Sequence, residues 1–490
     1  MENPITRICS HQLWFAILIS FLLCTILLCF DSLSTNINGV TFSVNKQQNP
    51  FVIMKNMTSS DDAHSSCAGR YIYVHDLPTR FNHDLLHNCQ LLTRGTDKPN
   101  MCPYMENQGL GPEIESSHGV LTNGSWYSTN QFLLEVIFHH RMKNYKCLTN
   151  DSSLASAIFV PFYAGLDVSR FLWDSNLTVR DSSGLDLVQW LARKPEWKKM
   201  WGRDHFLVSG RISWDFRRQY DDDINGSSWG SKFRFLPESM NMSMLAVEAS
   251  SWNNDYAIPY PTSFHPSKDS EILQWQNKIR LQNRPYLFTF TGAPRPELEN
   301  SIRGKIIEHC RSSSACRFID CSNIDGEKCD NPINVIKVFE KSVFCLQPPG
   351  DSYTRRSIFD SMLAGCVPVF FHPGTAYSQY LWFLPRNRTK YSVYIPVRDV
   401  KDWDVNVERV LMGFSEDEVS ALREEVIKLI PRIIYADPRF KLEKHEDAFD
   451  FAVKGMLERI EQVREVIRNG GDPSVGFADE NHYKYTFSDN

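Results

Sequence analysis

Two adjacent arginines, Arg355 and Arg356, follow a strand-like apolar run in residues 344–371 and stand where a helix is expected to begin. In an open parallel sheet, ligands bind where strands end and loops lead into helices. The amino end of a helix presents unpaired N–H groups and a positive dipole, which suit an anion. Two guanidinium groups add permanent charge and forked donors. The stretch therefore predicts a diphosphate site that needs no metal ion.

The turn before the arginines and the helix after them supply further candidate ligands. A rigid Pro-Pro-Gly turn ends at Gly350, and the next two residues, Asp351 and Ser352, are both suited to cap the helix. Asp360 lies four residues after Arg356 on the same helical face, where it can accept hydrogen bonds from vicinal ribose hydroxyls. A diphosphate next to a ribose indicates a nucleotide sugar. The alternative is a solvated helix start with an i,i+4 ion pair.

The surrounding chain alternates strand-like and helix-like segments, which favours an α/β protein with a largely parallel sheet. Strands are predicted where aromatic and β-branched residues run into a turn, and helices where the apolar period is longer. The predicted strands are 70–78, 155–165, 204–210, 284–292, 342–347 and 367–371, and the predicted helices are 129–143 with Thr129 as N-cap, 301–310 and 353–365. Residues 416–468 are predicted to close the fold as long helices broken at Pro431 and Pro438.

Length and composition predict two domains with accessory segments. The chain has 490 residues, of which 42% are hydrophobic and 23% charged, as in an ordinary globular protein. The formal net charge of −5 gives no reason to expect a nucleic acid as partner. The proline-rich segment 256–266 is the predicted boundary. The predicted parts are a cytosolic tail (1–12), a transmembrane signal anchor (13–30), a lumenal stalk (31–66), an acceptor-side Rossmann-like domain (67–265), a nucleotide-sugar-binding domain (266–440) and a closing helix and tail (441–490).

The amino-terminal segment is apolar enough to cross a membrane. Leu13 to Phe30 carry no charge over 18 residues, about the length that a membrane-spanning helix needs. A cleaved signal peptide is the alternative, but no clear small-x-small cleavage site follows before Asp31. Arg7 lies on the short side of the segment, so the weak positive-inside bias places the N-terminus in the cytosol. We therefore expect a single-pass type II membrane protein.

Sequons and cysteines agree with a lumenal location for the rest of the chain. Seven Asn-x-Ser/Thr sequons predict N-glycosylation, at Asn56, Asn123, Asn150, Asn176, Asn225, Asn241 and Asn387. Ten of the 13 cysteines follow the anchor, an even number that permits complete pairing in an oxidising compartment. The pairing itself stays open. One cluster has gaps too wide for a zinc site, so disulfides are favoured there: Cys310, Cys316, Cys321 and Cys329.

Longer stretches of the sequence resemble the plant exostosin-like glycosyltransferases, and within them the xyloglucan galactosyltransferase clade. The stretches are IYVHDLP (72–78), WYSTNQFLLEVIFHHRMKNYKCLTND (126–151), VPFYAGLD (160–167), GRDHFLVSGRISWDFRR (202–218), FTGAPRP (290–296) and 344–371. The resemblance covers about residues 67–465. It implies the GT-B architecture, with two Rossmann-like domains facing a cleft, in an inverting Golgi enzyme. It also implies transfer of galactose from UDP-galactose, in β-linkage, to xylosyl side chains of xyloglucan for the cell wall.

The resemblance and the positions of individual residues suggest the roles in such a reaction. The predicted UDP-sugar ligands are Arg295, Gly350, Ser352, Arg355, Arg356 and Asp360, and the last stands where the broader exostosin pattern commonly has Glu. An inverting transfer also needs a base for the acceptor hydroxyl. The candidates, placed at or after predicted strand ends of the first domain, are Asp167, Asp204, His205 and Asp215. Asp215 is favoured among them, and the alternative for each is a turn or cap residue. Tyr377 and Trp382 are the predicted acceptor contacts.

Several alternatives stay open. Asp221 and Asp223 form an Asp-x-Asp pattern that suits Mn²⁺ under a nucleotide diphosphate, but the acidic run adjoins a sequon and reads as an exposed loop. We therefore expect no metal requirement and no tightly bound cofactor. Other functions are a sister specificity (galacturonosyl or arabinosyl transfer to xyloglucan, or transfer to pectin or xylan) and an inactive glycan-binding scaffold. The expected partners are the UDP-sugar, xyloglucan, the membrane and other Golgi glycosyltransferases in complexes.

Overall fold

The computed structural model describes most of the chain after residue 66. The described residues are 67–92, 100–115, 121, 124–172, 176–219, 221, 229–299, 301–322, 329 and 331–476. The predicted anchor (13–30) and stalk (31–66) lie outside them. Within the described part, none of the helices has both the length and the apolar character required for a membrane crossing.

The first sheet contains five strands in the order of the chain, and every neighbouring pair is parallel. Its strands are β1 (Ile72–Val74), β2 (Ala157–Phe159), β3 (His205–Ser209), β4 (Ser243–Ala246) and β5 (Asp255–Ala257). Strands β2 to β5 are buried along their whole length, as expected for a parallel sheet covered on both faces. The strand predictions at 70–78, 155–165 and 204–210 are confirmed, and β4 and β5 were not predicted.

The second sheet also contains five strands, in the order β10-β9-β8-β6-β7, and all its pairs are parallel. Its strands are β6 (Tyr286–Gly292), β7 (Cys316–Asp320), β8 (Ser342–Gln347), β9 (Val367–Phe370) and β10 (Val393–Tyr394). The predicted boundary at 265/266 falls between β5 and β6, where the chain passes from the first sheet to the second. Two parallel sheets confirm the expected α/β class.

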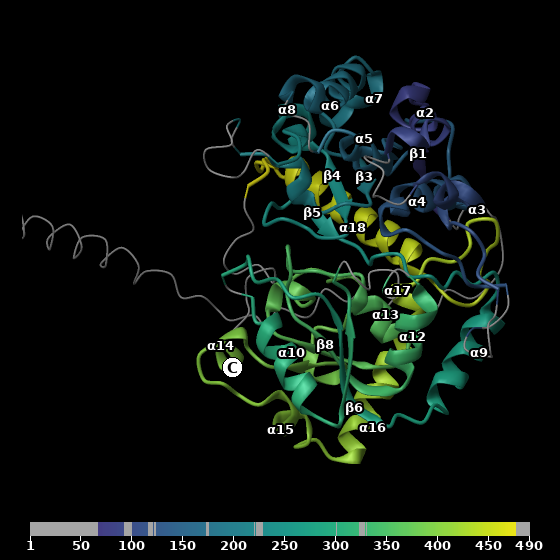
Figure 1. Ribbon diagram of the computed structural model, residues 1–490. Helices are drawn as coiled ribbons and strands as arrows, with labels where there is room; N and C mark the ends of the chain where they lie inside the picture. Colours follow the sequence, from purple (N-terminus) through teal and green to yellow (C-terminus); the bar gives the residue numbers. More distant parts are fainter. Residues whose placement is uncertain are drawn as a thin grey trace, which may run out of the picture. The chain divides into compact units, whose positions relative to one another are not determined.

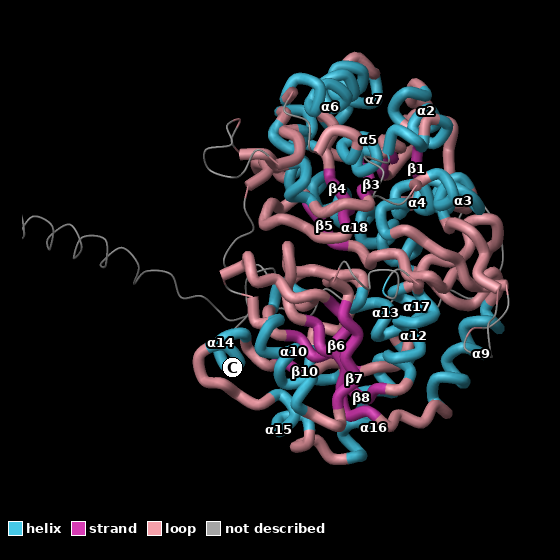
Figure 2. Tube along the Cα trace, in the orientation of Figure 1, coloured by secondary structure: helices cyan, strands magenta, loops and turns pink. Residues whose placement is uncertain are grey.

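Helices connect the strands and cover both faces of the second sheet, as Figure 2 shows for its magenta strands. The helices are α2 (His83–His87), α3 (Glu106–Gly109), α4 (Leu134–Lys143), α5 (Ala164–Ser169), α6 (Leu177–Ala192), α7 (Pro195–Met200), α8 (Pro237–Asn241), α9 (Asp269–Arg280), α10 (Arg303–Ser312), α12 (Pro332–Glu340), α13 (Ser357–Leu363), α14 (Val397–Lys401), α15 (Val407–Leu411), α16 (Glu416–Lys428), α17 (Ile430–Ile433) and α18 (Ala448–Arg468). Short 3-10 turns are η2 (Thr79–Phe81), η3 (Cys89–Leu92), η4 (Cys102–Met105), η5 (Gln131–Leu133), η6 (Ser213–Phe216), η8 (Phe233–Phe235), η9 (Pro373–Thr375) and η10 (Arg388–Lys390).

The last helix, α18, returns to the first sheet. Figure 1 shows it in yellow in the part of the molecule that holds the first sheet, and it contacts β2. Phe449 packs its ring 4.7 Å from the ring of Phe138 on α4. The Arg141 guanidinium makes a buried ion pair of 3.1 Å with Asp447, the N-cap of α18. Residues from the two ends of the described chain therefore share one core.

The prediction of long closing helices is confirmed, with breaks close to the expected prolines. Helix α16 ends at Lys428, and Pro431 lies in the first turn of α17, where its missing N–H has no partner to lose. Pro438 lies in the non-helical segment between α17 and α18. Thr129 does not cap the predicted helix over 129–143, because Asn130 accepts the hydrogen bond from the N–H of Phe132 instead, at 3.0 Å.

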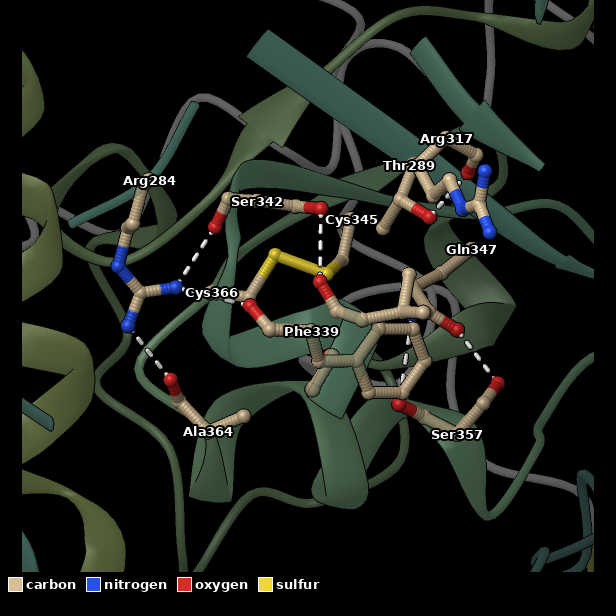
Figure 3. The surroundings of a disulfide bond; sticks show 12 residues. Arg284, Thr289, Arg317, Phe339, Ser342, Cys345, Gln347, Ser357, Ala364 and Cys366 are labelled. Atoms are coloured by element: carbon tan, nitrogen blue, oxygen red, sulfur yellow. Dashed lines mark hydrogen bonds between the residues drawn. A yellow bond between two sulfur atoms is a disulfide. The ribbon is translucent and has the colours of Figure 1, made fainter. Parts of the chain in front are cut away.

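All ten cysteines that follow the predicted anchor are paired. The disulfides are Cys67–Cys147, Cys89–Cys102, Cys310–Cys316, Cys321–Cys329 and Cys345–Cys366. The expectation of complete pairing is confirmed, and the cluster weighed as a zinc site holds two disulfides. Figure 3 shows the pair that ties β8 to the residue just before β9, with Arg284 close to it. The Arg284 guanidinium donates to the carbonyls of Phe339, Ser342 and Ala364 around this bridge.

Candidate active site

A cavity of about 1030 Å³ lies where loops from both sheets meet. The loops follow β3, β4 and β5 of the first sheet and β6, β8, β9 and β10 of the second. Ligands of open parallel sheets bind beyond the carboxyl ends of the strands, and this cavity has that position for both sheets. Its wall includes Arg211, Trp214, Asp215, Trp229, Glu248, Tyr260, Gly350, Asp351, Ser352, Tyr353, Arg355 and His372.

Arg355 is the predicted anion ligand that faces this cavity. Its Nη1 donates to Ser352 Oγ at 2.9 Å, while its buried Nη2 has no hydrogen-bond partner among the described residues. A Cβ built on Gly350 would lie only 2.1 Å from that Nη2. Glycine at position 350 therefore lets the guanidinium approach the turn. A buried, partnerless donor is costly, so this atom is suited to receive an acceptor from a ligand.

Arg303 is a second guanidinium at the same turn that was not predicted from the sequence, and, like Arg295 and Arg356, it does not itself line the cavity. Its Nε donates to Pro349 O at 2.9 Å, and a Cβ on Gly350 would lie 2.8 Å from its Nη2. Burial, together with the nearby charges of Arg355 and Arg295, lowers the pKa of Arg303 to about 10. Its place at the first residue of α10, the helix after β6, was the available signal. Two positive charges this close together are stabilised by an anion that binds near both of them.

Arg295 lies beside this pair but does not line the cavity. Its Nε donates to Asp351 Oδ1 at 2.7 Å, and this hydrogen bond lowers the pKa of Asp351. Asp351 was one of the two predicted helix caps. Neither it nor Ser352 caps α13, because that helix begins only at Ser357.

The late start of α13 has a visible cause at Thr354. Its backbone N–H and its hydroxyl both donate to Glu248 Oε2, at 2.7 and 2.6 Å. These bonds hold Thr354 against the loop that follows β4, and α13 begins three residues later. The predicted helix over 353–365 is therefore wrong at its amino end by four residues.

Arg356 points away from the cavity, unlike Arg355. Its Nε forms an ion pair of 3.2 Å with Asp360, its Nη2 donates to Ser263 Oγ at 2.8 Å, and its Nη1 donates to Thr129 O. Burial raises the pKa of Asp360, and Arg356 opposes that rise. The Arg356–Asp360 ion pair, which was the alternative to a ligand role, is therefore present, but it is largely buried and not solvated. Neither residue lines the cavity, so their diphosphate and ribose roles have no support from this geometry.

Among the predicted base candidates, Asp215 lines the cavity. It lies on η6, and its Oδ2 accepts from Arg211 Nη1 at 3.1 Å, while its Oδ1 accepts from the indole N–H of Trp229 at 2.7 Å. Trp214 and Trp229 flank it, and each is 38% exposed. Exposed indoles beside a carboxylate are suited to hold the apolar face of a sugar.

The other base candidates lie elsewhere. Asp204 and His205 stand at the start of β3, the end opposite to the cavity, and are fully buried. His205 Nδ1 bonds Asp204 Oδ1 at 2.8 Å, and its Nε2 lies 3.1 Å from that of His75. Asp167 is buried on α5 in an ion pair with Arg170. Both stand at the amino end of β3, as the predicted strand 204–210 has them, so they lie away from the carboxyl ends where the cavity forms.

The predicted acceptor contacts are also outside the cavity wall. The Tyr377 hydroxyl bonds Ser392 Oγ at 2.8 Å, and burial raises its pKa. Trp382 stacks on Tyr256 with ring centres 4.9 Å apart, and a Cβ on Gly455 of α18 would lie 2.3 Å from its indole. Both aromatic side chains pack between elements of the fold.

The aromatic wall of the cavity comes from residues that the sequence reading did not select. Tyr353 is 46% exposed and stacks on His372 with ring centres 4.3 Å apart and an interplanar angle of 9°. Tyr260 is buried opposite them, and its hydroxyl bonds Thr354 Oγ1 at 3.0 Å. His372 stands two residues after β9, so its place after a strand end was the signal that could have found it.

Asp221, the first residue of the Asp-x-Asp pattern considered for Mn²⁺, pairs with two basic side chains. It forms ion pairs with Arg218 at 3.2 Å and Lys232 at 2.6 Å. Asp223 lies outside the described residues. Across the part of the chain that the structure describes, no three His, Cys, Asp or Glu residues gather as a metal site.

Four of the sequon asparagines fall in the described part. Asn150, Asn176 and Asn387 are exposed and Asn241 is partly so. Asn176 caps α6, and Asn387 caps η10, each through its side-chain oxygen. The remaining sequons, Asn56, Asn123 and Asn225, lie outside the described residues.

Comparison with known proteins identifies the family. The Exostosin GT47 domain matches residues 66–411. Probable xyloglucan galactosyltransferase GT14 of Arabidopsis thaliana is 59% identical, over 98% of this chain and 93% of that protein. Xyloglucan galactosyltransferase MUR3 of Arabidopsis thaliana is 51% identical, over 89% of this chain and 69% of that protein.

Among solved structures, the crystal structure of a glycosyltransferase from Rickettsia africae ESF-5 is similar at 9% identity and a TM-score of 0.34. The match covers 69% of this chain and 95% of that one, and a score this low bears on neither fold nor function. The family match and the two plant relatives span most of the described residues, including every loop of the cavity wall. The chain therefore belongs to the exostosin GT47 family of glycosyltransferases.

Proposed function

We propose that this glycosyltransferase moves galactose from UDP-galactose to xylosyl side chains of xyloglucan, with inversion to a β-linkage. The relatives at 51% and 59% identity are named xyloglucan galactosyltransferases, which supports this choice of donor and acceptor. Two parallel sheets whose carboxyl ends meet at one cavity support the GT-B architecture.

The observation that carries the proposal is the arginine pair at Gly350. Arg303 and Arg355 both approach Gly350, Arg355 itself lines the cavity, and Nη2 of Arg355 lacks a partner among the described residues. A diphosphate would accept hydrogen bonds from both and would neutralise their charge. In the transition state, negative charge grows on the departing diphosphate, so donors held in place lower the barrier. This pair, with Ser352 as support for Arg355, replaces the predicted pair Arg355–Arg356.

The acceptor enters from the side of the first sheet. Trp214 and Trp229 supply exposed indole surface there, and the Arg211–Asp215 ion pair between them offers polar contacts to sugar hydroxyls. An acceptor hydroxyl oxygen attacks the anomeric carbon of galactose, and the bond from that carbon to the diphosphate oxygen breaks. The electron pair of the broken bond leaves with UDP, and the hydroxyl proton passes to a carboxylate of the first sheet.

Neutralisation of the diphosphate by guanidinium groups makes a metal unnecessary in this scheme. UDP binds through Arg355, which lines the cavity, with the charge of Arg303 behind Gly350, and the sugar lies between this turn and the indoles. The stacked rings of Tyr353 and His372 offer a flat apolar surface in the same cavity. These assignments leave Arg356 and Asp360 as residues that hold the cavity loops together.

The proposed location is the Golgi membrane, with the catalytic part in the lumen. The apolar segment 13–30, five disulfides and the exposed sequon at Asn387 support a secretory compartment. Assembly with other Golgi glycosyltransferases extends the same proposal. Treatment of the protein from plant microsomes with a peptide N-glycosidase should reduce its mass, and an unchanged mass would contradict the lumenal location.

The substrates are tested by offering the purified protein xyloglucan oligosaccharides with a panel of UDP-sugars. We expect transfer from UDP-galactose alone, with product NMR showing β-galactose on a xylosyl residue. Transfer from UDP-galacturonic acid or a UDP-arabinose, or transfer to pectin or xylan oligosaccharides, would replace the proposed specificity with a sister one. Absence of both transfer and UDP-sugar hydrolysis would identify a glycan-binding scaffold.

A further inference from the structure

Glu248 is a buried carboxylate in the wall of the cavity. It stands two residues after β4 and is only 1% exposed. Both of its hydrogen bonds reach the same oxygen, Oε2, and come from Thr354 at 2.7 and 2.6 Å. Its other oxygen, Oε1, accepts no hydrogen bond from any residue that the structure describes. Such an arrangement orients the carboxylate and leaves one oxygen for a ligand.

Asp215, the favoured base candidate from the sequence, is occupied at both oxygens. Arg211 donates to its Oδ2 and Trp229 to its Oδ1. A proton accepted by Asp215 would compete with one of these donors, and loss of the first would leave a guanidinium unpaired. Glu248 Oε1 has no such partner to lose. Of the two, Glu248 is therefore the better placed to receive a proton.

The remaining carboxylates of the cavity lie on the side of the second sheet. Glu297, Glu299 and Asp351 stand on the loops after β6 and β8, next to the arginine pair, and are exposed. In an inverting displacement, the attacking hydroxyl and the leaving diphosphate lie on opposite sides of the anomeric carbon. A base beside the diphosphate would therefore be on the wrong side, which again favours the first sheet.

We propose that Glu248 is the general base of the transfer. Its Oε1 accepts the proton of the acceptor hydroxyl while the hydroxyl oxygen bonds to the anomeric carbon, and the electron pair of the broken bond leaves with UDP. Asp215 is then a positioning residue that holds Arg211 and Trp229 around the acceptor. The assignment rests on the proposed function, because it takes the acceptor to be a hydroxyl group.

The contacts of Glu248 couple this base to the donor site. The Tyr260 hydroxyl bonds Thr354 Oγ1 at 3.0 Å, and the Thr354 hydroxyl donates to Glu248. Thr354 directly precedes Arg355, so one short segment orients the base and carries a diphosphate ligand. Burial raises the pKa of Tyr260, the charges of Glu248 and Asp215 raise it as well, and Arg355 lowers it, so all three charges act on this one hydroxyl.

The test compares Glu248→Gln with Asp215→Asn in the full-length enzyme. Glutamine keeps the shape of the side chain and can still accept both hydrogen bonds from Thr354, so the loop should hold its conformation. We expect Glu248→Gln to lower kcat by about 10³-fold, within the range for loss of a general base, with Kd for UDP unchanged by calorimetry. The fall of kcat/KM at acid pH should disappear in this variant and persist in Asp215→Asn.

A purely structural role for Glu248 predicts a different pattern. Thr354→Val removes the hydroxyl bond to Oε2 but keeps the carboxylate, so it serves as the matched control. If Glu248 only held the loop, Glu248→Gln would keep the wild-type kcat, Thr354→Val alone would weaken UDP binding, and kcat/KM would still fall at acid pH in both. That result, or loss of the acid limb in Asp215→Asn instead, would overturn the assignment.

Failure of the base assignment can be told apart from failure of the proposed function. The wild-type enzyme is first assayed with the panel of UDP-sugars and acceptors, and a substrate pair other than UDP-galactose and xyloglucan refutes the proposed specificity alone. The variants are then compared on the pair that reacts. If the wild type transfers no sugar to a hydroxyl acceptor, the base assignment falls with the proposed function.

Discussion

The arginine pair at Gly350 makes a quantitative prediction for Gly350→Ala. The new Cβ would lie 2.1 Å from Nη2 of Arg355 and 2.8 Å from Nη2 of Arg303, and both distances are shorter than real Cβ contacts. Each clashing atom is the far end of a long side chain. The guanidinium groups should therefore move, by about 1 Å or more, while the backbone keeps its conformation, a displacement known to matter at catalytic groups.

The size of the effect follows from the bonds at stake. A hydrogen bond to a charged group contributes about 1.5–3 kcal/mol, so loss of one from the diphosphate should weaken UDP binding by about 10- to 100-fold. Calorimetric titration of the full-length protein with UDP measures Kd, and a thermal melt shows whether the fold is intact. We expect the higher Kd with a Tm close to that of the wild type.

Gly304→Ala is the matched control, because nothing lies within 4 Å of a Cβ built there and the residue follows Arg303 directly in α10. It should bind UDP as the wild type does. A double-mutant cycle with Arg355→Ala sharpens the test. In a protein that already carries Arg355→Ala, the change Gly350→Ala should weaken UDP binding little further, because the guanidinium group of Arg355 is already absent. Wild-type affinity in Gly350→Ala itself would refute the assignment of the diphosphate to this turn.

Three further predictions concern stability and metal dependence. Arg356→Ala breaks the pair with Asp360 and the bond to Thr129 O, so it should lower the free energy of unfolding by about 3 kcal/mol and leave Kd for UDP unchanged; a stable variant with lost affinity would restore the diphosphate role. Burial lowers the pKa of His75 and of His139 to about 3, below the 6.5 of the unfolded chain. The contribution of these neutral histidines to the free energy of unfolding is fully present above pH 6.5 and is lost as the pH falls toward 3, by about 1.4 kcal/mol per pH unit for each. The Tm should therefore drop between pH 6.5 and 5, and a constant Tm would contradict this. EDTA should leave galactose transfer intact, and a complete loss that Mn²⁺ reverses would return the metal hypothesis.

Much of the fold follows from local patterns in the sequence. Buried parallel strands read as short apolar runs that end in turns, which is why β1, β2, β3, β6, β8 and β9 are predicted. Of the missed strands, β10 has only two residues and β7 is partly exposed, while β4 and β5 are buried but only four and three residues long. The return of α18 to the first sheet depends on contacts such as Arg141–Asp447, 306 residues apart, which no local pattern encodes.

The cavity was harder to predict, because its residues are brought together by long-range contacts. Arg303 and Arg355 meet at one turn although 52 positions separate them, and Glu248 reaches Thr354 across 106 positions. Residue type and position after a strand selected Arg355, Gly350, Ser352 and Asp215, which do line the cavity. The same rule selected Asp167, which a buried ion pair holds elsewhere.

The different fates of Arg355 and Arg356 show where sequence reasoning reached its limit. At the start of a regular helix, both arginines would lie near the positive end of the helix dipole, so diphosphate binding was predicted for both. The hydrogen bonds from Thr354 to Glu248 keep this segment out of the helix, so Arg355 faces the cavity and Arg356 turns toward Thr129 and Asp360. A carboxylate from the other sheet thus decides which arginine meets the ligand. If that carboxylate is also the base, donor recognition and proton transfer depend on the same contact, and the pH profile of Thr354→Val measures how strongly.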